Sequence, residues 1–146
     1  MPDKVNIINE LLISVFNDML KLEETALKNG VFSDISVIEV HTIEAIGMYV
    51  HSTMSQIAKT LKITVGTLTV AVNRLVKKGY VERFNHQQDR RVVLLGLTNK
   101  GRLMFRVHEK FHKDLLNEVI GKMNEDQTDA LTGALVSLRD YLGRRG

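Results

Sequence analysis

Residues 53–97 read TMSQIAKTLKITVGTLTVAVNRLVKKGYVERFNHQQDRRVVLLGL, and the spacing of the apolar residues changes once, near the middle of this stretch. Thr53, with a glutamine three residues later, is a capping-box pattern and predicts the start of a short helix. After the turn KIT, a second helix is predicted from about Val65 to Lys78, where Gly79 supplies a C-cap. The first half of the stretch therefore predicts two helices joined by a tight turn.

The second half of the stretch has the pattern of extended chain. The segments YVERF and VVLLGL are rich in β-branched and aromatic residues, and a polar segment separates them. This pattern predicts a β-hairpin with a charged tip. Two helices followed directly by a hairpin make a winged helix-turn-helix, in which one helix enters the major groove of DNA and the basic loop enters the minor groove. The expected fold class is mainly α with a small β wing of two or three strands.

Amphipathic helices are predicted on both sides of this stretch, from apolar residues that recur every three or four positions. They cover about residues 5–29, 36–47, 98–121 and 124–143. We expect one domain over residues 1–146, with a winged helix-turn-helix core at about 36–97 and dimerisation helices at about 5–29 and 98–143. The apolar stripes of the first and last helices are expected to pair between two subunits, so the expected assembly is a homodimer.

The composition fits one globular domain with an anionic partner. The 146 residues are 44% hydrophobic and carry a formal net charge of +3, which favours binding to a polyanion without establishing it. Cysteine is absent, so disulfides and cysteine-ligated zinc are excluded, and a reducing cytoplasm is the expected location. The sequence has neither an export-signal pattern nor an apolar run of membrane-spanning length, so we expect no membrane association.

The candidate DNA-binding residues lie on one face of the second helix and at the hairpin tip. On a helical wheel Leu68, Val72 and Leu75 point inward, which leaves small, polar and basic residues outside. The expected DNA-binding residues are Thr67, Thr69, Val70, Asn73, Arg74, Lys77, Asp89, Arg90 and Arg91. Hydroxyl and amide groups can bond phosphates and base edges, and arginine can enter a narrow A·T minor groove. Asp89 is expected to brace the arginine next to it.

The stretch IAKTLKITVGTLTVAVNRLVKKGYVERFNHQQDRRVVLLGLTNKG resembles the DNA-binding core of the MarR family of dimeric transcription regulators, and the resemblance extends over essentially the whole chain. The family's wing-tip motif, Asp, any residue, then Arg, falls on Asp89 and Arg91. The family pattern on the recognition helix falls on Thr67, Thr69, Asn73 and Arg74. Many members carry a basic residue where this chain has Val70, so the resemblance does not carry over a base code, and contact with a thymine methyl group becomes more plausible.

The segments DISVIEVHTIEAIG, TVGTLT, QDRRVV and GRLMFRVHEKFHKDLL resemble the branch of that family that represses fatty-acid-synthesis genes in Gram-positive bacteria. This resemblance implies a corepressor, a long-chain acyl group carried on acyl carrier protein. It also implies that neither a metal, a cofactor nor catalysis is needed. The acyl chain is expected among apolar and histidine side chains of three helices: Phe16, Ile43, Met104, Val107, His108 and Phe111.

The predicted helix over about 98–121 carries a basic stripe on the other side. Arg102, Arg106, Lys110 and Lys113 fall within about 80° of one another by helical geometry. An acidic carrier protein that delivers a lipid chain would use both the stripe and the apolar side. The same pattern also fits an ordinary solvated face over an ordinary core, and the family resemblance is what favours binding of the carrier.

Other functions follow less directly from the residues. His108 and His112 have the spacing of a metal-binding pair, but no third ligand is identifiable by spacing, so we expect no metal site. The sequence lacks a nucleophile elbow, a phosphate-binding glycine loop and a placed pair of carboxylates, so we expect no enzymatic activity. Two alternatives stay open: a MarR-type repressor that a small aromatic ligand releases from DNA, and an architectural DNA-binding protein without a ligand.

For the repressor, we expect the two-fold axis of the dimer to place two recognition helices about one helical turn of DNA apart. The operator is then expected to be an inverted repeat of double-stranded DNA. The direction of a ligand's effect on operator affinity distinguishes corepression from release. Sequence specificity distinguishes a repressor from an architectural protein.

Overall fold

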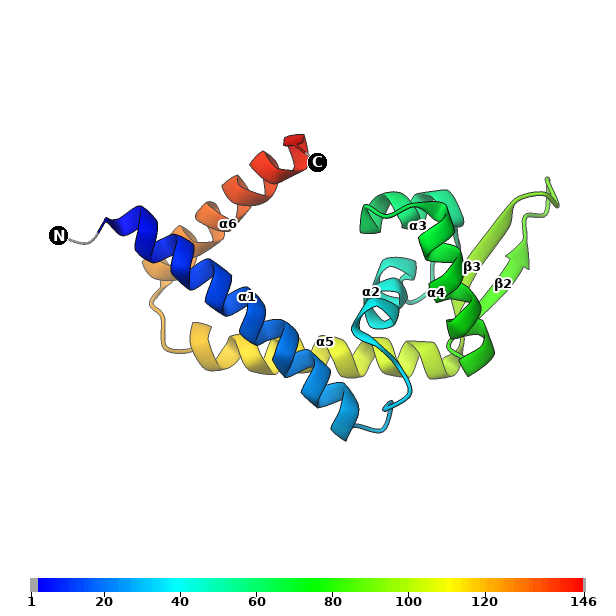
Figure 1. Cartoon of the computed structure of the whole chain (residues 1–146), viewed down its shortest axis with the longest axis horizontal. Helices are drawn as coiled ribbons and strands as arrows, with labels where there is room; N and C mark the ends of the chain where they lie inside the picture. The colour runs from blue at the N-terminus through cyan, green and yellow to red at the C-terminus, as the bar shows by residue number, and fades with distance from the viewer. Residues whose placement is uncertain (1–2, 146) are drawn as a thin grey trace. The chain divides into compact units, whose positions relative to one another are not determined.

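The computed structural model describes residues 3–145, so the outermost ends of the expected domain, residues 1, 2 and 146, lie outside the described residues. The chain divides into two compact units between Met104 and Phe105. The elements are α1 (Lys4–Asn29), α2 (Val37–Ile46), β1 (Ser52–Thr53), α3 (Met54–Leu61), α4 (Val65–Lys78), β2 (Val81–Asn85), β3 (Val93–Leu97), α5 (Asn99–Ile120) and α6 (Glu125–Arg145). The predicted fold class, mainly helical with a small β wing, is confirmed (Figure 1).

Side-chain caps fix the ends of the helix-turn-helix. At the start of α3 the Thr53 backbone N–H donates to Gln56 at 2.9 Å, and the Gln56 backbone N–H donates to the Thr53 hydroxyl at 3.1 Å, so the capping box is complete. The Thr64 hydroxyl caps α4. Gly79 ends α4 with φ of 88°, a left-handed conformation that glycine adopts without steric cost. The predicted bounds of α4 are therefore confirmed.

The wing is a three-stranded antiparallel sheet in the order β1-β3-β2. The pairs run from Val81 opposite Leu97 to Asn85 opposite Val93, which leaves residues 86–92 as the wing loop. The two-residue strand β1 pairs with β3 and leads directly into α3. This pairing joins the wing to the helix-turn-helix within one unit, and in Figure 1 the wing loop lies at the edge of that unit.

The core of this unit lies between α2, α3, α4 and the sheet. Leu68, Val72 and Leu75 of α4 have no exposed surface, as predicted. Residues of the other elements that are at most 2% exposed include Val40, Ile43, Ile46, Ile57, Tyr80, Val81 and Leu95. Because α4 buries one face completely, its opposite face is held at a fixed angle to the wing.

A polar cluster joins the start of α2 to the end of α4. The Lys78 ammonium group lies 2.9 Å from the Glu39 carboxyl group and also donates to the backbone carbonyl of Asp34. The Ser36 hydroxyl donates to the same carboxyl group at 2.9 Å. Tyr80 donates to Asp34 at 2.6 Å, and its burial together with this bond raises the pKa of the Tyr80 hydroxyl above its ordinary value. These bonds tie together segments more than thirty residues apart in the sequence.

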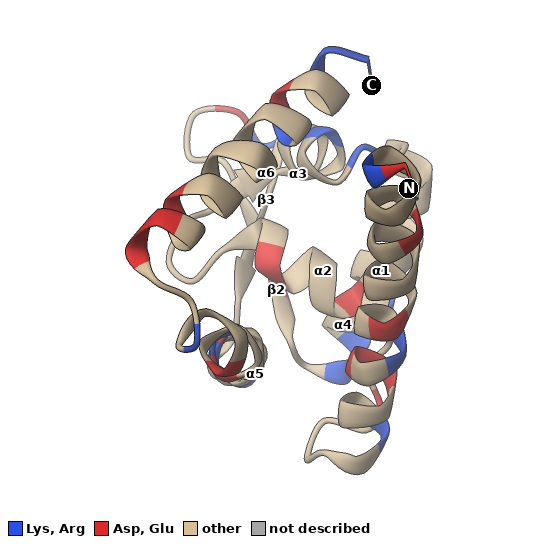
Figure 2. Ribbon diagram, turned by 90° about the vertical axis from the view of Figure 1, so that its left-hand side faces the viewer, with Lys and Arg blue, Asp and Glu red and all other residues tan. Residues whose placement is uncertain are grey.

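The second unit consists of the rest of α5, from Phe105, and of α6. Glu125 and Asp126 lie in the first turn of α6 and Arg144 and Arg145 in its last turn, so the charges match the helix dipole. Figure 2 shows this arrangement as a red start and a blue end of the helix. Among residues 3–145, no helix combines the length and the apolar run needed to cross a bilayer.

Candidate nucleic-acid interface

The predicted reading face of α4 is exposed. Thr67, Asn73, Arg74 and Lys77 are exposed, Thr69 is half-buried, and Val70 exposes 52% of its surface. A polar face with one apolar residue at its centre can place hydrogen-bonding groups in the major groove of DNA, together with an apolar group that contacts a thymine methyl.

Two of the threonine hydroxyls on this face already have partners within the helix. The Thr69 hydroxyl donates to the carbonyl of Val65 at 2.8 Å. The Thr67 hydroxyl lies 2.9 Å from that of Thr64, the N-cap of α4. Both hydroxyl oxygens keep capacity as acceptors, and a hydroxyl that serves as donor to a helix carbonyl is oriented before DNA arrives.

The wing tip holds one arginine in a fixed position. The Nε and Nη2 atoms of Arg91 each donate to the Asp89 carboxylate at 3.1 Å, and the Arg91 backbone N–H donates to it at 3.0 Å. The arginine that Asp89 braces is therefore Arg91, two residues on, and not the adjacent Arg90. The Arg91 side chain is 91% exposed, so the brace leaves it available to DNA.

The same bonds also lower the pKa of the Asp89 carboxyl group. The side-chain bond from Arg91, with the backbone bond, holds the pKa of Asp89 below its ordinary value. Because the pKa is lowered in the folded state, the brace is complete above the ordinary pKa of an aspartate and is lost as the pH falls through the lowered value. The Asp89–Arg91 pair is thus formed throughout the neutral range.

Arg83 is a cationic residue of this surface that the sequence analysis did not single out. It is exposed on β2, and its Nη2 donates to the Asn73 side-chain oxygen on α4. The alternation of residues in the strand VERF would have predicted that Arg83 lies on the same face as Val81. The bond to Asn73 could not be predicted in this way, because it depends on how the sheet packs on α4.

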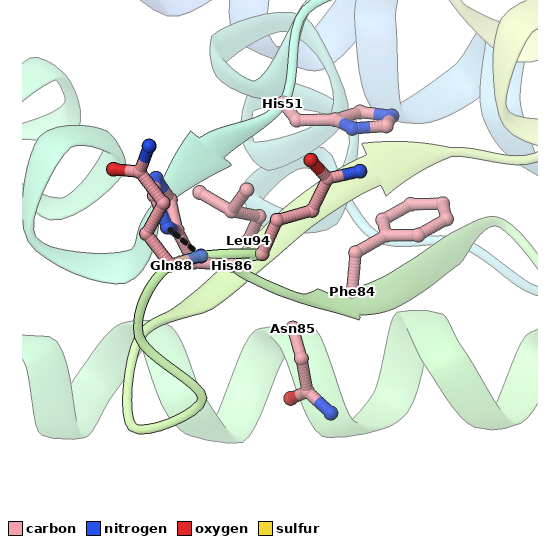
Figure 3. Close-up of a pocket in the computed structure, with 7 residues that line it drawn as sticks. His51, Phe84, Asn85, His86, Gln88 and Leu94 are labelled. Carbon is pink, nitrogen blue, oxygen red and sulfur yellow. Dashed lines mark hydrogen bonds between the residues drawn. The ribbon is translucent and has the colours of Figure 1, made fainter.

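A pocket of about 540 Å³ lies on the wing (Figure 3). The His51 ring stacks on the Phe84 ring, with centroids 4.3 Å apart and planes at 16°. Gly96 permits this stack, because a Cβ there would lie 2.8 Å from His51 and 3.0 Å from Phe84. Asn85 points to the other side of β2 from Phe84 (Figure 3). The two faces of the wing therefore differ, and one of them carries Arg83 and Asn85.

An apolar groove lies along α1 in the first unit, with a volume of about 360 Å³. Its lining residues are Leu12, Val15, Phe16, Met19, Leu20, Glu23 and His41. The Glu23 side chain is 7% exposed, and its carboxyl group lies 3.6 Å from Nε2 of His41 on α2. The groove thus combines an apolar wall with one buried carboxyl group.

The six residues expected to hold an acyl chain have different environments. Phe16 lines the groove along α1 and is 64% exposed. Ile43 and Met104 belong to the core of the first unit, at 0% and 2% exposure. In the second unit, Val107 is 47% exposed, His108 is buried at 5%, and Phe111 is half-buried.

The expected basic stripe on α5 is partly neutralised. Lys110 pairs with Asp114 at 2.6 Å and Lys113 with Glu109 at 2.8 Å, each four residues away on the helix. The bond from Glu109 raises the pKa of Lys113 above its ordinary value. These pairs are exposed to solvent, which screens their attraction, so they contribute little to stability and an acidic partner can replace them.

Arg102, at the start of α5, has structural partners. Its Nη1 donates to the carbonyl of Leu97 at 2.8 Å, and its Nη2 donates to the side chain of Asn99. The guanidinium group also lies 5.7 Å from the centre of the Tyr49 ring. Arg102 therefore secures the junction of β3 and α5 in addition to any contact with a carrier.

His108 and His112 of α5 contact each other within the second unit. Their Nε2 atoms lie 3.2 Å apart, and the ring of His112 meets that of His108 edge-on. A hydrogen bond between two imidazoles accounts for this distance, with one ring as donor and the other as acceptor.

Comparison with known proteins gives matches over the reading head, which is the helix-turn-helix of α3 and α4 with the wing, and over nearly the whole chain. Residues 33–92 match the profile described as the MarR family. The crystal structure of Streptococcus pneumoniae FabT in complex with DNA contains a chain 43% identical to this one, with a TM-score of 0.92 and a match that covers 97% of this chain and 99% of that chain.

Two curated relatives have lower identity. The multiple antibiotic resistance protein MarR of Escherichia coli (strain K12) is 27% identical over 90% of this chain and 94% of its own length. The HTH-type transcriptional regulator PchR of Bacillus subtilis (strain 168) is 27% identical over 53% of this chain, and the match spans 46% of PchR.

Proposed function

The chain belongs to the MarR family of DNA-binding transcription regulators, and from that premise we propose that it represses fatty-acid-synthesis genes with long-chain acyl-acyl carrier protein as corepressor. The family consists of regulators and not of enzymes. The observation that carries the proposal is the likeness, over almost the full length, to a FabT chain that was crystallised with DNA. The resemblance of four sequence segments to the fatty-acid branch supports the class of target genes.

The reading head supports recognition of an inverted-repeat operator. An exposed polar face on α4 and a braced arginine at the wing tip suit the major and the minor groove. In a two-fold dimer these two elements occur twice, so each half of an inverted repeat meets the same side chains. Thr67, Thr69, Val70, Asn73, Arg74, Lys77, Asp89, Arg90 and Arg91 form the proposed contact surface.

The groove along α1 supports an acyl ligand. Its volume of about 360 Å³ lies in the range of small-molecule sites, and most of its wall is apolar. Each methylene group that an acyl chain buries there contributes about 0.8 kcal/mol. A hydrocarbon chain gains affinity from such a wall without any specific polar contact.

The buried carboxyl group of the groove favours an acyl group on a carrier over a free fatty acid. Glu23 is 6% exposed, and a fatty-acid carboxylate brought beside its carboxyl group would lose most of its hydration in a region with little water. An acyl thioester has no charge at that end. The positive charges that would meet the acidic surface of a carrier lie instead on α5, at Arg106, Lys110 and Lys113.

We expect long-chain acyl-acyl carrier protein to tighten operator binding, whereas free fatty acid and unacylated carrier do so much less. Arg106→Glu with Lys110→Glu should abolish the effect of the carrier without changing the basal DNA affinity. Val107→Phe should remove the dependence on acyl chain length, because Val107 is one of the six residues expected to hold the acyl chain. Gel shifts at one salt concentration, with and without each form of the carrier, measure all three effects.

Lys122→Glu is the matched control, because it reverses a charge in the turn after α5 and outside the stripe. It should leave the response to the carrier intact. Unchanged operator affinity with every form of the carrier would contradict the corepressor. Release of DNA by a small aromatic compound would instead support the other type of MarR regulator, and binding governed by A·T content alone would support an architectural protein.

We predict that the apolar stripes of α1 and α6 pair between two subunits and make a dimer. Seven apolar residues, Ile7, Leu11, Val15, Leu131, Leu135, Leu138 and Leu142, expose between 38% and 57% of their surface. A second copy of the chain would remove this surface from water. Sedimentation at low micromolar concentration is expected to show dimer only, and a stable folded monomer there would contradict the prediction.

A further inference from the structure

Arg83 and Asn73 join the wing to the reading face of α4. Successive strand residues point to opposite faces of a sheet, so Arg83 shares a face with Val81 and Asn85, and Phe84 lies on the other. The register places Arg83 opposite the fully buried Leu95, on the face that packs against the helices. The arginine side chain extends from this position to the side chain of Asn73.

The chemistry of this pair fixes the orientation of the Asn73 amide group. A guanidinium group has only N–H donors, so the atom of Asn73 that faces Arg83 must be the oxygen. The Nδ2 group, with its two donors, is then directed away from Arg83. An asparagine without such a partner can turn its amide by half a rotation and can offer either atom to a base.

We propose that Arg83 is a specificity-determining positioning residue that holds Asn73 as a hydrogen-bond donor toward the major groove. The inference rests on operator binding by α4 and does not depend on an acyl ligand. The acceptors that such a donor can reach are N7 and O6 of guanine, N7 of adenine and O4 of thymine. Cytosine presents only a donor in the major groove, so the reading head should disfavour cytosine at the base that Asn73 meets.

A binding panel tests this proposal. The probes are a duplex enriched by the parent protein from random double-stranded DNA, together with every single base-pair variant of that duplex. Asn73→Ala identifies the base pair that Asn73 reads. At this base pair, Arg83→Met should reduce the discrimination against cytosine roughly three- to tenfold, the range for one lost hydrogen bond. Discrimination at the other base pairs should stay as in the parent.

Two further variants separate positioning from a structural role. Asn73→Asp keeps an acceptor for Arg83 but has no donor, so the preference at the same base pair should change toward cytosine, whose amino group then finds an acceptor. Arg83→Lys keeps a donor to Asn73 and should restore part of the discrimination that Arg83→Met loses. In an Asn73→Ala background, Arg83→Met should cause no additional loss at this base pair.

A phosphate contact by Arg83 would give a different result. Arg83→Met would then weaken binding to all the duplexes equally and reduce the salt dependence by about one ion, with the preference at each base pair unchanged. That outcome, or an unaltered preference in Asn73→Asp, would overturn the proposal. The panel contains no carrier or lipid, so its result is independent of the corepressor experiment.

Discussion

Replacing Lys78 by methionine is expected to lower the free energy of unfolding by about 3 kcal/mol, the lower end of the range for breaking a buried ion pair. Methionine keeps most of the apolar stem of lysine but leaves the carboxyl group of Glu39, whose side chain is 4% exposed, without its ammonium partner. The Lys78 side chain is itself 28% exposed, and the Ser36 hydroxyl still donates to Glu39, so the loss should stay at that lower end. Urea unfolding at a fixed protein concentration measures the change.

Lys59→Met, at an exposed position of α3, is the matched control and should change stability by no more than about 0.5 kcal/mol. Adding Glu39→Gln to Lys78→Met removes the buried charge and should recover part of the loss. A Lys78→Met protein as stable as the parent would show that the polar cluster does not hold the start of α2 to the end of α4.

Replacing Arg91 by alanine is expected to weaken operator binding by about 1 to 3 kcal/mol and to leave folding unchanged. The side chain is 91% exposed and contacts Asp89 at the wing tip, so its removal opens no cavity in the core. The loss should appear in DNA binding alone. Gel shifts at constant salt and thermal unfolding of the same samples measure the two quantities.

Thr67→Ala and Arg74→Ala should also weaken binding, because both residues lie on the exposed side of α4. Arg91→Lys keeps the charge but cannot make the two-atom contact with Asp89, so its affinity should lie between those of the parent and Arg91→Ala. Parent-like affinity of the Arg91→Ala protein at the same salt concentration would refute the assignment of the wing.

Local signals predicted the reading head well. The Thr53 capping box and Gly79 act within a few residues of the helix ends that they determine, so the sequence alone located α3 and α4. The strand β1 is different. Ser52 and Thr53 are too short a segment to have a periodicity of their own, and they become a strand only by pairing with Leu94 and Leu95.

Interactions between distant residues escaped the sequence analysis. Glu39 and Lys78, and Asn73 and Arg83, are joined by tertiary packing that no periodicity reveals. The pairing of Lys113 with Glu109 is a contrasting case, because a four-residue spacing on a helix is readable from the sequence. Reading the basic residues without their acidic neighbours overstated the positive charge of the stripe.

The bonds between Asp89 and Arg91 have a further consequence for the thermodynamics of DNA binding. Immobilising a long side chain at an interface costs about 0.5 to 1.5 kcal/mol of conformational entropy. The carboxylate already restricts the Nε and Nη2 atoms of Arg91, and the donors of Nη1 are not engaged by it. Part of that entropy is therefore lost when the chain folds and not when it meets DNA, so in the proposed complex the wing arginine would enter the minor groove preorganised.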